Sequence, residues 1–234
     1  MVCRFDSGAA MGGLQVMFVG HYAAALAAKA VEPRAPLWTL IAGAQLIDIG
    51  WAGLVMAGVE KIRFNPDLPG SPLELYHMPW THSLPAVLVW SLAALALCRW
   101  ILRLPWGACV AVALVVFSHW ALDFLVHRPD LELWFGGPKV GLGWWDYPDA
   151  EKTLEMGLIA LTGGAWLWSR GAWSRSPWPA LAFIAFLVIL QIVAGLTVPT
   201  GSTVAYGRTA LIVFLVVVGV AALADFQKRK PETA

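Results

Sequence analysis

Seven long apolar stretches follow one another along the chain, and each is long enough to cross a lipid bilayer as an α-helix. They cover residues 11–31, 37–59, 83–102, 106–127, 150–168, 178–198 and 205–225. Proline residues fall at the joins rather than deep inside these stretches, as expected where helices begin and end. The sequence therefore predicts an all-α fold, a polytopic membrane helical bundle with about seven transmembrane helices.

Composition supports a membrane protein and excludes an ordinary soluble domain. Of the 234 residues, 59% are hydrophobic and only 13% are charged, whereas a soluble domain carries about 25% charged residues. We expect a single membrane domain over residues 1–234, with the site helices in residues 11–130 and additional scaffold helices in residues 150–225. The net charge of +1 and the lack of a large basic tract predict no nucleic-acid partner.

Basic residues give a weak indication of orientation in the membrane. The connections on one side, together with Lys228-Arg229-Lys230 at the C-terminus, carry slightly more Lys and Arg than the connections on the other side. Positive charge favours the cytoplasmic side of a membrane. The pattern predicts a cytoplasmic C-terminus and, with seven spans, an N-terminus on the opposite side.

Histidine and aspartate residues interrupt the apolar stretches. His21 lies in the first stretch and Asp48 in the second, and His119, Asp123 and His127 are spaced by four along one helical face. A carboxylate inside a membrane helix needs a compensating partner. Since these helices carry no lysine or arginine at matching depth, we expect histidine to be the partner, directly or through a metal ion.

A second histidine pair lies just before the third apolar stretch, in Tyr76-His77-Met78-Pro79-Trp80-Thr81-His82-Ser83-Leu84-Pro85. Either Thr81 or Ser83 can cap the following helix, with Pro85 in its first turn. His77 and His82 would then lie at the mouth of the helix, on the same side as His127. The N-terminus of this helix could receive a phosphate or carboxylate group of a substrate.

Neutral imidazole and carboxylate together are ligands for Zn²⁺, Mn²⁺ or Fe²⁺. Seven candidates exceed one tetrahedral zinc site, so they fit two metals or one metal with additional catalytic groups. The residues expected to bind metal are His21, Asp48, His82, His119 and Asp123. His77 and His127 are expected to be further ligands or catalytic proton-transfer groups. An open site of this kind would activate water for attack on an ester or phosphoester.

The order of these residues resembles the YdjM-like family of bacterial inner-membrane metal-dependent hydrolases. The resemblance covers roughly residues 1–130 and rests on His21, Asp48, the segment His77-Met78-Pro79-Trp80-Thr81-His82-Ser83-Leu84, and His119-Trp120-Ala121-Leu122-Asp123. It implies an integral protein of the bacterial inner membrane with a divalent metal, zinc in the first place. The ligand order is also similar to that of helical zinc-dependent phospholipases C, which implies phosphoester chemistry by analogy.

This chain departs from the family pattern at two positions. Asp48 stands alone where the family often has Pro-Asp-x-Asp, and Met78 replaces a basic residue that is common there. These departures bear on a second metal more than on the first. Because the site would open beside the bilayer, the expected substrate is a lipid-like or small-molecule ester or phosphoester.

Two other functions fit the same residues. Histidine and aspartate chains inside membranes also form proton or ion relays, although a transporter of that kind favours polar residues in both membrane halves and inverted repeats. A non-enzymatic membrane scaffold would use the cluster for stability alone.

The loop of residues 128–149 is rich in aromatic residues and has two interpretations: an interfacial belt, or a lid that guides an amphipathic substrate. Glu151 and Glu155 favour a solvated start of the fifth helix over a metal ligand or a general base.

Overall fold

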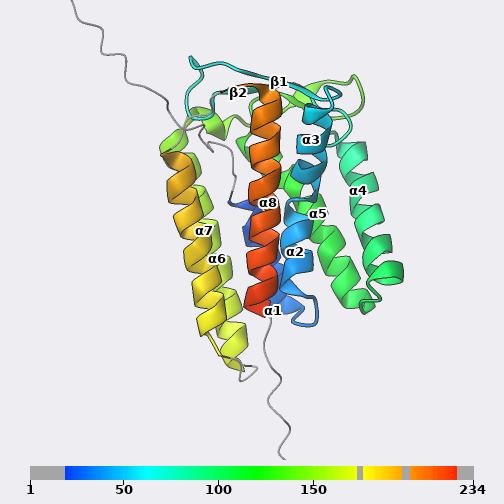
Figure 1. Cartoon of the computed structure of the whole chain (residues 1–234), viewed down its shortest axis with the longest axis vertical. Helices are drawn as coiled ribbons and strands as arrows, with labels where there is room; N and C mark the ends of the chain where they lie inside the picture. Colours follow the sequence, from blue (N-terminus) through cyan, green and yellow to red (C-terminus); the bar gives the residue numbers. More distant parts are fainter. Residues whose placement is uncertain (1–18, 173–175, 197–200, 226–234) are drawn as a thin grey trace, which may run out of the picture.

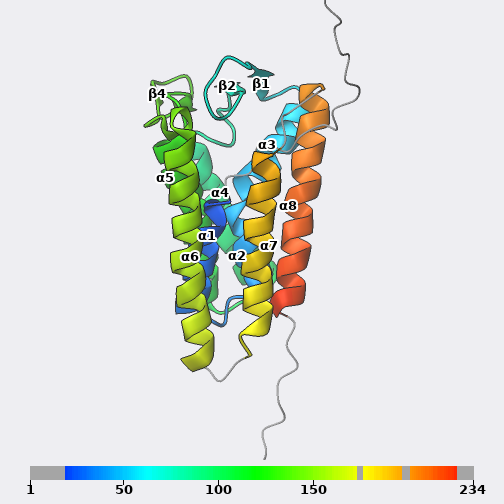
Figure 2. The same ribbon diagram turned by 90° about the vertical axis from the view of Figure 1, so that its left-hand side faces the viewer.

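The computed structural model describes residues 19–172, 176–196 and 201–225, which form a helical bundle capped at one end by two small hairpins (Figures 1 and 2). The helices are α1 (His21–Val31), α2 (Leu37–Ala44), α3 (Leu46–Met56), α4 (Leu84–Ala96), α5 (Trp106–Val126), α6 (Pro148–Ala172), α7 (Trp178–Gly195) and α8 (Thr203–Asp225). A π-helical turn, η1 (Leu97–Ile101), extends α4, and a 3₁₀ turn, η2 (Trp144–Asp146), precedes α6. The expectation of an all-α fold is confirmed, with the hairpins as small additions.

The expected count of seven membrane spans is not confirmed. Four helical segments are long and apolar enough to cross a membrane: Leu84–Ile101, Trp106–Val126, Trp178–Gly195 and Thr203–Asp225. The pair α2 and α3 makes a fifth if it is one span, bent by 49°. Within the described residues α1 has only 11 residues, because residues 11–18 of the expected first span lie outside them. Helix α6 has charged residues in its first turns. These long apolar helices suggest a membrane protein.

The predicted helix starts at proline are confirmed where the chain turns into α4. Ser83 is the N-cap residue, and its hydroxyl accepts a hydrogen bond from the backbone N–H of Ala86 at 3.3 Å, with Pro85 in the first turn. Helices α5 and α7 likewise start directly after Pro105 and Pro177. Between the two candidate caps, Ser83 therefore fills the role, which leaves Thr81 available for another contact.

Helix α1 lies inside the bundle, where it packs against α2, α5 and α6 (Figure 2). Its Tyr22 and Leu26 side chains are fully buried, and Leu40 of α2 is buried in the same core. Helices α6 and α7 meet through the buried rings of Trp166 and Phe183, which contact edge to face at a centroid distance of 6.4 Å. Burying each of these large side chains contributes about 1.5–3 kcal/mol to stability.

A buried ion pair closes the end of the bundle opposite to the hairpins. Nζ of Lys29 lies 3.0 Å from Oδ1 of Asp225 and donates a hydrogen bond to the carbonyl of Ala35 at 2.6 Å. The Asp225 carboxylate also accepts from the backbone N–H of Leu37 at 2.8 Å, at the start of α2. This pair joins α1, α2 and the end of α8. The basic residues 228–230 lie outside the described residues.

The hairpin end is closed by β1 (Lys61–Phe64) with β2 (Leu73–His77), and by β3 (Leu131–Glu132) with β4 (Lys139–Val140), each pair antiparallel. On the first hairpin Arg63 donates side-chain hydrogen bonds to Glu74, which hold the pKa of that carboxyl below its usual value. The guanidinium of Arg128 joins the two hairpin regions, since it bonds to the carbonyl of Pro69 at 2.6 Å and to Asp146 at 2.7 Å.

Candidate metal centre

The structure brings all five expected metal ligands to one place below the hairpins. His21 is the first residue of α1, Asp48 lies in the first turn of α3, and His82 lies just before α4. His119 and Asp123 stand one turn apart on α5. The histidines and Asp123 are almost completely buried, whereas the side chain of Asp48 keeps 21% of its exposure. Segments far apart in the sequence therefore converge on a single buried cluster.

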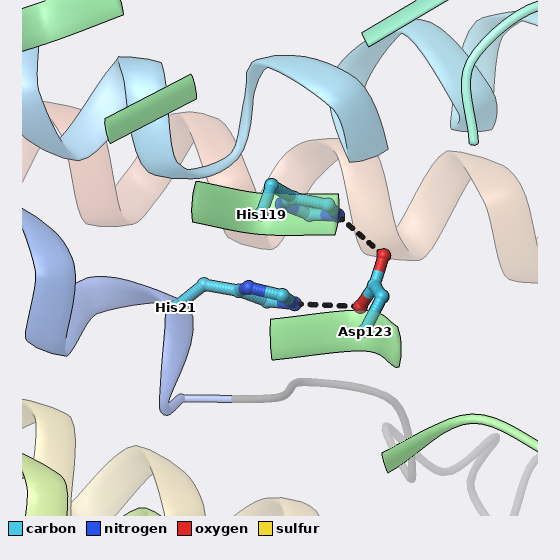
Figure 3. Close-up of side chains that lie close together, drawn as sticks. All are labelled: His21, His119 and Asp123. Carbon is cyan, nitrogen blue, oxygen red and sulfur yellow. Dashed lines mark ion pairs between the residues drawn. The ribbon is translucent and has the colours of Figure 1, made fainter. Parts of the chain in front are cut away.

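The carboxylate of Asp123 is the centre of this cluster. Its Oδ1 lies 3.1 Å from Nε2 of His21 and 3.4 Å from Nε2 of His127. Its Oδ2 lies 3.2 Å from Nε2 of His119 and 3.6 Å from Nε2 of His82. Figure 3 shows the two oxygens turned toward His21 and His119, whose rings lie parallel to each other. Each oxygen of Asp123 thus faces a different group of histidines.

Asp48 adds a second carboxylate on the far side of the cluster. Its Oδ1 lies 3.3 Å from Nε2 of His82 and 3.5 Å from Nε2 of His119. Two sets of three residues could hold a metal ion, with ligand atoms all within 4.8 Å of one another: His21, His119 and Asp123, and Asp48, His82 and His119. His119 belongs to both sets, so the arrangement can accept one ion or two adjacent ions.

A backbone carbonyl fixes the protonation of His119. The chain bends at Gln45 between α2 and α3, and the carbonyl oxygen of Ala44 at this bend lies 2.8 Å from Nδ1 of His119. A carbonyl can only accept, so Nδ1 carries the proton and donates it. In the neutral imidazole, Nε2 then carries an unprotonated lone pair. A metal-binding histidine has the same arrangement, because one ring nitrogen donates to the protein and the other binds the metal. The ring of His21 stacks on that of His119 at 3.8 Å, which disfavours two charged rings.

A side-chain relay fixes the protonation of His82 in the same way. The hydroxyl of Thr81 donates its single proton to Oε2 of Glu60 at 2.7 Å, so its oxygen accepts from Nδ1 of His82, also at 2.7 Å. Glu60 is buried, and its other oxygen accepts from the backbone N–H groups of Trp80 and Thr81 at 2.9 and 3.0 Å. With Nδ1 protonated, Nε2 of His82 presents a lone pair to the two aspartates.

His127 has the same type of support. Its Nδ1 lies 2.9 Å from Oδ1 of Asp130 and donates to it. Its ring lies against Trp145 at a centroid distance of 4.0 Å, while Nε2 faces Asp123. His127 is the residue that ends α5, with an extended backbone, and it still continues the four-residue spacing predicted from the sequence.

The donor set fits a divalent metal. Lone pairs on Nε2 of His82, His119 and His127 face carboxylate oxygens, and such pairs repel unless a proton or a cation lies between them. Nε2 of His119 and Oδ2 of Asp123 are buried and make no hydrogen bond within the part of the chain that the structure describes. Two ligands at about 2.0–2.2 Å from a tetrahedral zinc ion are about 3.3 Å apart. The nitrogen–oxygen distances of 3.1 to 3.6 Å agree with that spacing.

A cavity of about 120 Å³ adjoins the cluster. Its lining includes His21, Asp48, His82, Asp123 and His127 on one side. The other sides come from α3, from β2 and the loop before it, from η2 and the start of α6, and from α7 and α8. The residues are Trp51, Gly70, Ser71, Leu73, Leu75, Trp145, Pro148, Glu151, Lys152, Gln191, Ala194, Gly195 and Phe214. Four of the five metal-binding candidates therefore face a space that a small molecule can occupy, and His119 lies behind them.

Not every candidate from the sequence joins the cluster. His77 ends β2, where it pairs with Lys61, and it is neither a cavity-lining residue nor an ion-pair partner of the aspartates in the described chain. Glu155 does not belong to a solvated helix start, since it is fully buried and accepts a hydrogen bond from Gln191. Glu151, half-buried, lines the cavity.

Sequence reasoning missed Glu60 and Asp130, the two carboxylates that orient His82 and His127. Both lie just beyond the ends of apolar stretches, where acidic residues usually face water. The only available signal concerned Asp130, which follows His127 by three residues, whereas Glu60 is distant in sequence from His82 and gave no local signal. Comparisons of the chain with protein-family models, curated proteins and solved structures found no match.

Proposed function

We propose that this protein is an integral-membrane metal-dependent hydrolase that cleaves an ester or phosphoester. The observation that carries the proposal is the set of buried histidines whose Nε2 lone pairs converge on Asp123 and Asp48. His21, Asp48, His82, His119 and Asp123 would bind Zn²⁺, with Mn²⁺ or Fe²⁺ as alternatives. The order of the same residues along the chain, which resembles the YdjM-like family, agrees with this proposal.

A metal bound here would supply an activated water molecule for hydrolysis. The residues of the chain hold and orient the donor atoms: the Ala44 carbonyl orients His119, and Glu60 with Thr81 orients His82. His127 lines the cavity, and its Nδ1–H is held by Asp130, which is the arrangement of a histidine that transfers protons.

The expected location is the bacterial inner membrane with the C-terminus in the cytoplasm. Exposed tryptophans at the end of the bundle opposite to the hairpins support a membrane interface there: Trp100, Trp106, Trp168 and Trp178. In this orientation the cavity lies near the non-cytoplasmic face, because α8 ends on the side away from the hairpins (Figure 1).

The test is metal-dependent hydrolysis by the detergent-purified protein. Bis-p-nitrophenyl phosphate and p-nitrophenyl acetate report on phosphoester and ester cleavage, measured as isolated, after chelation, and after addition of Zn²⁺, Mn²⁺ or Fe²⁺. We expect cleavage that chelation abolishes, that metal restores, and that His119→Ala removes. His77→Ala is the matched control, since His77 lies outside the cluster. Turnover that survives both chelation and His119→Ala would contradict the proposal.

A further inference from the structure

The cavity beside the cluster has an apolar wall that the chemistry of the metal ligands does not require. Ala194 and Gly195 of α7 and Phe214 of α8 form this wall, next to the polar side chain of Gln191. Both helices are among those long and apolar enough to cross a membrane. The cavity therefore extends from the polar cluster to the inner side of two helices whose outer sides would face lipid.

The cavity is open to the surface at the C-terminal end of α7. Ala194 is buried and Gly195 is exposed, yet both line the cavity, so the cavity reaches the molecular surface beside Gly195. A Cβ added to Gly195 would meet no atom of the described residues within 4 Å. The neighbouring Ile192 and Leu196 are 56% and 81% exposed. The opening at Gly195 therefore lies in an apolar surface.

A single basic residue lines the cavity within the described chain. It is Lys152 in the first turns of α6, which is exposed to solvent. With a divalent metal on the opposite side, Lys152 gives the cavity two positive centres for an anionic group. A phosphate group fits this combination, and the opening beside Gly195 leads away from it along the apolar wall.

We propose that the ligand is an amphipathic phosphate ester, with its phosphate between the metal cluster and Lys152 and its hydrocarbon chain leaving the cavity past Gly195. This inference rests on the proposed function and narrows its substrate to a phosphate-bearing lipid. The choice of ligand follows from the cavity itself, which joins the candidate metal ligands and Lys152 to an opening in an apolar surface. A soluble phosphoester needs no such opening.

The experiment measures the binding of methyl, butyl and decyl phosphate to the metal-loaded, full-length protein in detergent. Binding is followed by equilibrium dialysis of the labelled alkyl phosphates, so that the result does not depend on turnover. We expect decyl phosphate to bind at least about tenfold more tightly than butyl phosphate, since burial of two methylene groups is enough for this difference. Lys152→Gln should weaken all three ligands by a similar factor.

Two glycine variants separate the proposed opening from the rest of the apolar surface. Gly195→Leu places a side chain in the opening, whereas Gly219→Leu adds the same side chain at an exposed position of α8 where a Cβ also meets nothing within 4 Å. We expect Gly195→Leu to abolish the preference for the decyl chain while methyl phosphate binding and metal content stay unchanged. Gly219→Leu should behave as wild type.

The outcomes distinguish the two proposals. If the protein binds metal and methyl phosphate but shows no chain-length preference, or if both glycine variants behave alike, the lipid inference is wrong and the hydrolase proposal stands. If the protein binds no metal, both proposals fail together.

Discussion

Exchanging Glu60 for glutamine should reverse the relay that orients His82. One oxygen of Glu60 accepts two backbone N–H groups, so the glutamine carbonyl must keep that position and its NH₂ group must face Thr81. The amide would then donate to the Thr81 hydroxyl, and the hydroxyl would donate to Nδ1 of His82, 2.7 Å away. His82 would change tautomer, with the proton on Nε2, where it blocks metal binding.

The size of the effect follows from the role of Glu60. Loss of a group that orients a metal-binding histidine typically lowers metal affinity by about 10–100-fold. This corresponds to about 1.4–2.8 kcal/mol of binding free energy. Removing the negative charge of Glu60 should lower the metal affinity further. Glu60 is only 1% exposed, and a buried carboxylate near the cluster attracts the bound cation.

The assay is a competition titration of purified protein with a zinc chelator of known affinity. Glu74→Gln is the matched control, since Glu74 is also on the first hairpin region but pairs with Arg63 at the surface. Thr81→Val should lower zinc affinity as Glu60→Gln does, and Thr81→Ser should restore it. Zinc affinities within twofold of wild type for both Glu60→Gln and Thr81→Val would refute the relay.

Three further outcomes follow from the structure. Gly70→Ala should lower the melting temperature and disturb Trp145 fluorescence, since Gly70 has a φ of +66° and an added Cβ would lie 2.1 Å from the Trp145 carbonyl oxygen; the strain alone costs about 1–3 kcal/mol. Lys29→Met should destabilise the protein by about 2 kcal/mol in thermal unfolding, because it leaves the partly buried Asp225 without its cation. Lowering the pH from 7 to 5 should release bound metal, measured by dialysis, because protons compete with the metal ion for the imidazole nitrogens and carboxylate oxygens that would bind it.

Matched controls accompany these predictions. Gly58→Ala tests backbone strain without a clash, since Gly58 has a φ of +71° and an open Cβ position, and it should cost less than Gly70→Ala. Arg34→Met removes an ion pair with Glu32 in which the arginine is exposed, and it should leave the melting temperature close to that of the wild type. If Gly58→Ala lowers the melting temperature as much as Gly70→Ala, the clash with Trp145 is not the cause. If Arg34→Met destabilises the protein as much as Lys29→Met, burial of the ion pair is not the cause. Metal that stays fully bound at pH 5 would contradict binding through imidazole nitrogens.

The site could be predicted because its signals are local. The four-residue spacing of His119, Asp123 and His127 is a property of any α-helix, and it places them on one face of α5 before anything is known of the fold. Asp48 and His21 were identifiable because polar side chains inside apolar helices need partners. The structure places all five residues in one cluster, although their role in metal binding stays a prediction.

Other features depend on tertiary contacts that leave no local pattern. The bend between α2 and α3 occurs at Gln45, where the sequence has no proline, and it turns the Ala44 carbonyl toward His119. Glu155 is buried by helix packing although it belongs to a charged helix start. The expected seven spans are not confirmed: among the described residues four helices, or five with the bent pair α2 and α3, are long and apolar enough, and α6, which carries Asp149 and Glu151 in its first turn and Arg170 in its last, is not one of them.

The most direct test of the account is the metal content of the detergent-purified protein by mass spectrometry, beside a His119→Ala, Asp123→Ala double variant and His77→Ala. The account predicts stoichiometric zinc, manganese or iron in the wild type and in His77→Ala, and its loss in the folded double variant. A wild-type protein that holds no metal, even after reconstitution with each of the three ions, would contradict the central claim and favour a proton relay or a structural cluster.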